Sequence, residues 1–207
     1  DNDGSVDGIL AIHAGPGAEQ GSRTQYIWSH RWVLNGGSSG AVTYDGKFIN
    51  DYMINPETRT SGANSNQVGI GVFVHEFGHN LGLPDLYDTD PNNGDSEGIG
   101  NWCVMAGGSW LGGEHRPINF SAWCRIENGW ETPQFLTIGN SLTDTLDASS
   151  TQQNEIRRIN TGVASEYFLL ENRQKTGLDL ELPGSGMAVW HINTIKTNGF
   201  GNGVNAD

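Results

Sequence analysis

The sequence predicts an α+β fold, and three observations support this prediction. Two segments have the pattern of helices: one follows a polar loop at residues 61–67 and ends at Gly82, and the other spans residues 116–128. Short runs rich in β-branched and aromatic residues alternate with turns rich in Gly, Asn and Ser, which is typical of strands. The 207 residues include 30 glycines, which favours a chain rich in loops.

Size and charge narrow the classes of function. A chain of 207 residues can form one domain with a sizeable core, or two small lobes around a cleft. Its 11 basic and 24 acidic residues give a net charge of −13. Such a surface repels nucleic acid and anionic membranes, and suits a protein that binds hard cations. No apolar run approaches the ~20 residues of a membrane span.

The most informative stretch runs from Val72 to Asp88 and contains the pattern H-E-x-x-H-x-x-G-x-x-D. His75 and His79 are four residues apart, so on a helix they lie one turn apart on the same face. That spacing lets two imidazoles bind one metal ion. Gly82 then lets the backbone leave the helix in a left-handed conformation, and Pro84 prevents the helix from resuming.

The same stretch supplies a third ligand and a base. Asp85 lies on the returning backbone, where its carboxylate can join the two imidazoles, and Glu76 lies beside His75 in position to act on a water molecule at the metal. The alternative is an amphipathic core helix in which two histidines happen to be four residues apart. Burying three polar groups in this apolar run without a partner is costly, which favours the metal site.

Two acidic loops predict calcium binding. Residues 1–7 read D-N-D-G-S-V-D, in which oxygen-bearing side chains around a Gly suit a hard cation, although an ordinary Asp/Asn/Gly turn has the same composition. The expected ligands in this loop are Asp1, Asp3 and Asp7. A second loop, residues 85–98, fits a calcium site and a solvated acidic loop equally well. Its candidate ligands are Asp88, Asp90, Asn93 and Asp95.

Several elements follow from local patterns. Gly8 to His13 has an apolar run that predicts a buried strand. Residues 42–54 predict a hairpin, with Asp45-Gly46 as a tight primed turn. Pro117 near the first turn and Gly129 after the last delimit the helix at residues 116–128. Further strand-like runs lie at residues 135–138, 156–159, 167–170 and 187–192.

The chain has two cysteines, Cys103 and Cys124. They could form one disulfide that closes a loop of moderate length, worth on the order of 3 kcal/mol. Two cysteines alone do not identify the redox compartment.

Together these residues resemble the immune inhibitor A family of secreted bacterial zinc metallopeptidases, which are relatives of the metzincins. Besides the helix, G-N-W-C-V-M-A-G-G-S-W at residues 100–110 is similar to the methionine turn of that family. Weaker similarities fall at residues 13–19, 27–32, 167–174 and 182–192. The resemblance implies a zincin-like fold with an active-site helix, a twisted sheet and a β-rich C-terminal part. It also implies that Met105 forms an apolar floor beneath the zinc histidines.

The resemblance has implications for domain organisation and location. It implies that residues 1–130 hold the catalytic core and that residues 131–207 continue the same domain. It also implies further elements before Asp1 and after Asp207, so we expect the chain to be incomplete at both ends. Other fragments or domains of the same precursor are expected partners, and the expected location is extracellular.

The sequence therefore predicts a secreted zinc endopeptidase that acts on protein or peptide substrates. His75, His79 and Asp85 would hold Zn²⁺, and Glu76 would be the general base for a zinc-activated water. The alternative is a calcium-stabilised extracellular binding or adhesion module with a structural or vestigial zinc site. Glu76 argues against this alternative, because a purely structural site has no need of a base.

Overall fold

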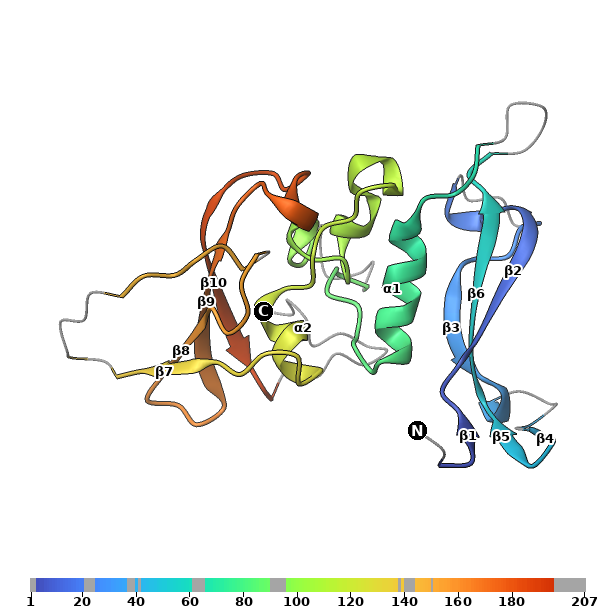
Figure 1. Ribbon diagram of the computed structural model, residues 1–207, viewed down its shortest axis with the longest axis horizontal. Coiled ribbons are helices and arrows are strands. Elements are labelled where there is room, and N and C mark those ends of the chain that lie inside the picture. Colours follow the sequence, from blue (N-terminus) through green and yellow to red (C-terminus); the bar gives the residue numbers. More distant parts are fainter. Residues whose placement is uncertain are drawn as a thin grey trace. The chain divides into compact units, whose positions relative to one another are not determined.

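The computed structural model describes residues 3–20, 25–36, 40, 42–60, 66–89, 96–137, 139, 144–149 and 151–195. The chain divides into two compact units, Asp1–Gly82 and Leu83–Asp207. Helices and several sheets occur together, which confirms the predicted α+β class (Figure 1). Within the described ranges, no helix is long and apolar enough to cross a membrane.

The described residues of the first unit form two three-stranded sheets. The larger sheet has the strand order β2 (Ile9–Pro16), β6 (Asp51–Thr58) and β3 (His30–Val33), with β2 parallel and β3 antiparallel to β6. The smaller sheet has the order β1 (Ser5–Val6), β5 (Lys47–Ile49) and β4 (Val42–Tyr44). Single 3₁₀ turns span Ala18–Gln20 and Leu34–Gly36.

The turn between β4 and β5 follows from its two central residues. Asp45 and Gly46 have φ values of 48° and 74°. Positive φ at both positions defines a primed turn, in which the backbone twist matches that of the flanking antiparallel strands. The predicted hairpin is therefore confirmed.

Helix α1 (Ile70–Asn80) contacts β6 and β3 (Figure 1). Its buried positions include Val72, His75 and Glu76, so the face with these residues is turned away from solvent. The helix ends as predicted: the Gly82 N–H donates to the His79 carbonyl at 3.0 Å, and Gly82 has a φ of 92°. A side chain at this φ would be strained, which explains why glycine occupies the exit of the helix.

The apolar run at residues 8–13 forms strand β2, but the prediction that it is buried is wrong. Ile9, Leu10 and Ile12 are 40%, 47% and 60% exposed. In the described sheet β2 is an edge strand with β6 as its neighbour, so it has a paired strand on one side only. A short apolar run does not distinguish a central strand from an edge strand.

The second unit is built on a four-stranded sheet with one short helix against it. The strand order is β10 (Gly186–Asn193), β9 (Glu166–Arg173), β8 (Ile156–Asn160) and β7 (Gln134–Leu136). Helix α2 (Ala122–Glu127) contacts β9. Along β9 the residues alternate between half-buried and buried, so Tyr167 and Leu169 meet Ala122 and Ile156 in one core cluster. Short 3₁₀ segments span Gly100–Trp102 and Gly177–Asp179, and a further 3₁₀ stretch, Gly107–Glu114, is kinked at residues 111–113.

Helix α2 is shorter than the sequence predicts. The helix begins after Ser121 and not near Arg116, because long-range partners take the backbone N–H groups of the preceding segment. The Ile118 N–H donates to the Gly108 carbonyl at 3.3 Å, and the Asn119 N–H donates to the Asp179 carboxylate at 3.0 Å. These bonds hold the segment in a non-helical path. The predicted end is confirmed, since Gly129 has a φ of 68°.

Candidate metal centre

The helical spacing brings two imidazoles of α1 together. Nε2 of His79 lies 3.1 Å from Nε2 of His75, and the ring centroids are 4.7 Å apart with the planes at 89°. Two nitrogen ligands at about 2.05 Å from a tetrahedral Zn²⁺ ion would lie about 3.3 Å apart. The observed separation of the two nitrogens therefore fits a shared metal ion.

Asp85 joins the two histidines. One ligand atom from each of His75, His79 and Asp85 lies within 4.8 Å of the other two. In the part of the chain that the structure describes, this is the one group of three or more His, Cys, Asp or Glu side chains with such geometry. Two nitrogens and a carboxylate oxygen are a donor set that zinc accepts in catalytic sites.

Both backbone polar groups of Leu86, the residue after Asp85, form hydrogen bonds. The Leu86 N–H donates to the Met105 carbonyl at 2.8 Å, and the Leu86 carbonyl accepts the Ile99 N–H at 3.0 Å. Gly98 makes this approach possible, because a Cβ there would lie 2.1 Å from the Leu86 oxygen. The chain therefore fixes the residue that follows the third candidate ligand.

Glu76 and Met105 occupy buried positions. Glu76 follows His75 on α1 and is 6% exposed. Met105 is fully buried between two 3₁₀ segments, and its carbonyl is the acceptor for Leu86. The predicted roles of the two residues, as general base and as apolar floor, remain predictions.

The predicted calcium ligands are described only in part. Asp3 is exposed and its carboxylate accepts the Ser5 N–H at 2.8 Å, while the Asp7 carbonyl accepts the Asn80 side-chain amide at 3.1 Å. Asp88 is half-buried. The other candidates lie outside the described residues: Asp1, Asp90, Asn93 and Asp95. Calcium binding therefore remains a prediction.

Cys103 and Cys124 are close together but are free thiols in the structure. Their sulfur atoms are 3.7 Å apart, against about 2.05 Å in a disulfide. The two thiols are therefore neighbours without a covalent bond, and the disulfide that the sequence allows remains a prediction.

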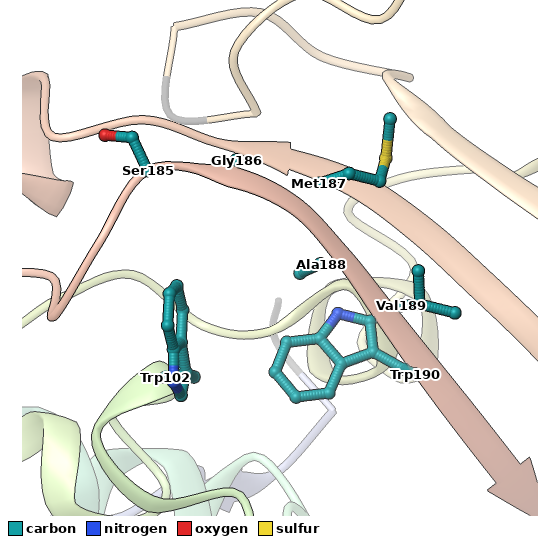
Figure 2. A pocket seen from close by; sticks show the side chains of 7 residues that line it. All are labelled: Trp102, Ser185, Gly186, Met187, Ala188, Val189 and Trp190. Carbon is teal, nitrogen blue, oxygen red and sulfur yellow. The ribbon is translucent and has the colours of Figure 1, made fainter.

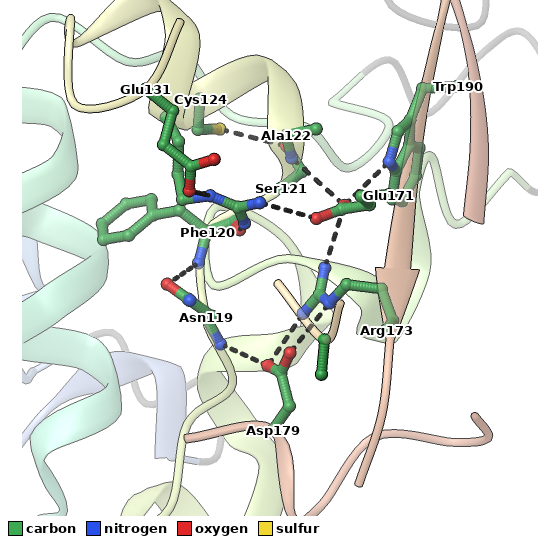
Figure 3. A network of polar contacts seen from close by, with 12 residues as sticks. Asn119, Phe120, Ser121, Ala122, Cys124, Glu131, Glu171, Arg173, Asp179 and Trp190 are labelled. Atoms are coloured by element: carbon green, nitrogen blue, oxygen red, sulfur yellow. Dashed lines mark hydrogen bonds and ion pairs between the residues drawn. The ribbon is translucent and has the colours of Figure 1, made fainter. Parts of the chain in front are cut away.

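Sequence reasoning missed most of a buried network of charged residues in the second unit (Figure 3). Arg173 donates to the Asp179 carboxylate at 2.8 Å and to Glu171 at 3.3 Å, and all three side chains are fully buried. Arg125 joins Glu171 to Glu131, at 2.8 Å and 2.7 Å. Arg125 and Glu171 are 46 positions apart, so no local pattern in the sequence indicates their pair.

The network controls the protonation of Glu171. Burial by itself raises the pKa of Glu171, but the charges of Arg125 and Arg173, with hydrogen bonds from Arg125 and Trp190, outweigh it. The pKa of this carboxyl is therefore lowered, and Glu171 stays ionised inside the core. Arg173 also donates to the Trp102 carbonyl at 3.0 Å, which ties the segment before Met105 to β9.

A cavity of about 260 Å³ lies along β10, lined by Trp102 and residues 185–190 (Figure 2). Trp102 and Trp190 form part of its wall. None of the candidate metal ligands lines it.

A helix that carries H-E-x-x-H, with a carboxylate near its two imidazoles, is typical of metallopeptidases. The sequence profile of the immune inhibitor A peptidase M6 catalytic domain matches residues 1–133. The chain belongs to this family of metalloproteases, which confirms the resemblance stated from the sequence.

Two relatives are similar to this chain over part of their length. Immune inhibitor A of Bacillus thuringiensis subsp. alesti is 44% identical over 121 residues, or 53% of this chain and 16% of the relative. Pre-pro-metalloprotease PrtV of Vibrio cholerae serotype O1 (strain M66-2) is 37% identical over 136 residues, or 59% of this chain and 14% of the relative. The chain thus spans a small part of the length of these relatives.

Proposed function

We propose that this chain carries the catalytic site of a secreted zinc endopeptidase that cleaves protein or peptide substrates. The observation that supports this most is that ligand atoms of His75, His79 and Asp85 lie within 4.8 Å of one another, while α1, which holds both histidines, also carries Glu76. Membership of a metalloprotease family supports the same reaction class. Secretion rests on the resemblance stated from the sequence.

The donor set fits zinc and leaves room for chemistry. Three protein ligands fill three of the four positions of a tetrahedral ion, as in catalytic rather than structural zinc sites. When bound, zinc would polarise the scissile carbonyl and lower the pKa of an attacking water from about 15.7 toward neutrality.

Glu76 is the proposed general base. It would accept the proton of the attacking water and then deliver that proton to the leaving amine. Its position directly after His75 on α1 keeps the carboxylate on a rigid element near the donor set. Glu76 is 6% exposed, so bulk water screens its charge weakly.

Other parts of the chain would support the site. Met105 would form the apolar floor of a metzincin-like fold, and residues 131–207 would continue the catalytic domain. Calcium bound at residues 1–7 or 85–98 would stiffen the loops that flank α1 and Asp85. Because the chain spans 16% and 14% of its relatives, further parts of a precursor are proposed partners.

The substitution Glu76→Gln tests the mechanism. The amide retains the size of the side chain but cannot accept the proton, so cleavage of casein should fall by about 10²–10⁴-fold. Zinc content, measured by elemental analysis of the dialysed protein, should stay at the wild-type value. A variant that cleaves casein at the wild-type rate would contradict the role of Glu76.

The same measurements separate the rival function. If the zinc-loaded wild-type chain binds the metal but never cleaves casein, the data favour an extracellular binding module with a structural zinc site. Cleavage that disappears with a zinc chelator and returns with added zinc favours the peptidase.

A further inference from the structure

Two buried thiols lie next to each other, one in the segment of Met105 and the other in helix α2. Cys103 lies two residues before Met105, and Cys124 lies in the first turn of α2. Both side chains are fully buried, and their sulfur atoms are 3.7 Å apart. This separation is short enough for a covalent bond after a small shift of either side chain.

The two sulfur atoms have different surroundings. The Cys103 sulfur accepts the backbone N–H of Met105 at 3.4 Å and that of Ser121 at 3.3 Å. The Cys124 sulfur accepts the Ser121 hydroxyl at 3.4 Å. Two backbone donors on one sulfur stabilise negative charge there, so the pair is asymmetric.

The pKa values follow this asymmetry. Burial raises the pKa of Cys103, but hydrogen bonds from Cys124, Ser121 and Met105 outweigh it and lower the pKa from 9.0 to about 7. Burial and the neighbouring Cys103 raise the pKa of Cys124 well above 9.0. Cys103 therefore ionises first, and the thiolate is the nucleophile in exchange with disulfides.

We propose that Cys103 and Cys124 are a dithiol site that a low-molecular-weight disulfide oxidises to an intramolecular disulfide, with Cys103 as the first attacking sulfur. The Cys103 thiolate attacks one sulfur of the oxidant and releases one thiol, which leaves a mixed disulfide on Cys103. Cys124 then loses its proton and attacks the Cys103 sulfur, which releases the second thiol. Two cysteine thiols are oxidised, and the oxidant disulfide is reduced to two thiols.

Burial determines when this exchange occurs. With both side chains fully buried, the oxidant reaches them in a local opening of the segment around Cys103. Once formed, the bond closes a loop between positions 21 residues apart. That loop contains Met105, whose carbonyl accepts the N–H next to Asp85. Oxidation would thus fix the Met105 segment to α2, independently of the zinc chemistry.

Intact mass spectrometry after incubation with oxidised glutathione tests the site. Wild-type protein should lose the mass of two hydrogen atoms and carry no glutathione, and dithiothreitol should reverse the change. The oxidised form should unfold at a temperature about 6–12 °C higher than the reduced form. An oxidised sample in which both cysteines react with iodoacetamide in denaturant, or carry glutathione, would overturn the proposal.

Two matched variants test the order of attack. Cys124→Ser should accumulate one glutathione adduct at Cys103, because the mixed disulfide cannot be resolved. Cys103→Ser should form its adduct several-fold more slowly, since burial still disfavours the thiolate of Cys124 when Cys103 is gone. Equal rates would contradict Cys103 as the first nucleophile. If either variant fails to fold, the wild-type mass measurement still decides whether the disulfide forms. The mass measurement and the adduct rates are both independent of zinc binding and of peptide cleavage.

Discussion

Helix α1 and the core around β9 both bury polar side chains, but the two regions use opposite arrangements. Around β9, acids and bases alternate: Arg173 lies between Glu171 and Asp179, and all three are fully buried. On α1 and the segment after it, the groups that converge are all electron-pair donors, from His75, His79 and Asp85. The first arrangement is neutralised within the chain, whereas the second suits a cation from solution.

Because of this difference, we expect the stability of the two regions to depend on different factors. The β9 core should depend on its own side chains and on pH, because it contains both partners of each ion pair. The metal-ligand segment should depend on zinc. Perturbations that separate these two dependences test the comparison directly.

The largest expected effect is the loss of a buried partner in the β9 core. Arg173→Met leaves Glu171 and Asp179 buried with one less cation, so it should lower the free energy of unfolding by about 3–5 kcal/mol. The matched control is Arg116→Met, which removes an exposed pair with Glu181 at 3.4 Å and should cost about 0–1 kcal/mol. Urea unfolding of both variants measures this difference, and equal losses would remove the contrast between buried and exposed pairs.

The next effect concerns the third candidate ligand. Asp85→Ala should weaken zinc binding by at least about 100-fold, because losing a ligand costs more than losing a residue that supports one. Glu127→Ala is the control: it removes an exposed acid at the end of α2, outside the proposed triad and both candidate calcium loops, and should leave zinc affinity unchanged. Competition with a chromophoric chelator gives both dissociation constants. If the two variants behave alike, Asp85 is not a zinc ligand.

Metal removal should affect only one of the two regions. At a zinc concentration about 100 times the dissociation constant, binding stabilises the folded state by about 2.7 kcal/mol, and a chelator should abolish this. Hydrogen exchange should then accelerate in α1 while the amides of β9 keep their protection. Faster exchange throughout β9 would show that the core depends on the metal as well.

The smallest effect is the response of the core to acid. The lowered pKa of Glu171 means that its ionised form stabilises the folded state above its ordinary pKa of 4.5. This contribution is lost as the pH falls below that value toward the lowered pKa, at up to about 1.4 kcal/mol per pH unit. Urea midpoints between pH 3 and 6 measure the slope, and Glu171→Gln should flatten it. An unchanged slope in that variant would assign the acid sensitivity to other groups.

The sequence predicted those features that local spacing determines. The helix with His75 and His79, its exit at Gly82 and the Asp45-Gly46 hairpin each depend on residues a few positions apart. The same spacing suggested Asp85, which the structure places near both imidazoles.

Features that depend on distant partners could not be predicted in the same way. Arg125 pairs with Glu171 across 46 positions, and Asn119 bonds Asp179 across 60. The latter bond, with that of Ile118, also explains why the segment after Arg116 is not helical. Edge or central position in a sheet is equally non-local, so the exposure of β2 was not predicted.

Diffraction at the zinc absorption edge, on crystals of the zinc-loaded protein, tests the central claim most directly. The account predicts one anomalous peak bound by Nε2 of His75, Nε2 of His79 and the Asp85 carboxylate, with no fourth protein ligand. A peak coordinated by a fourth side chain, or an Asp85 carboxylate directed away from both imidazoles, would contradict it.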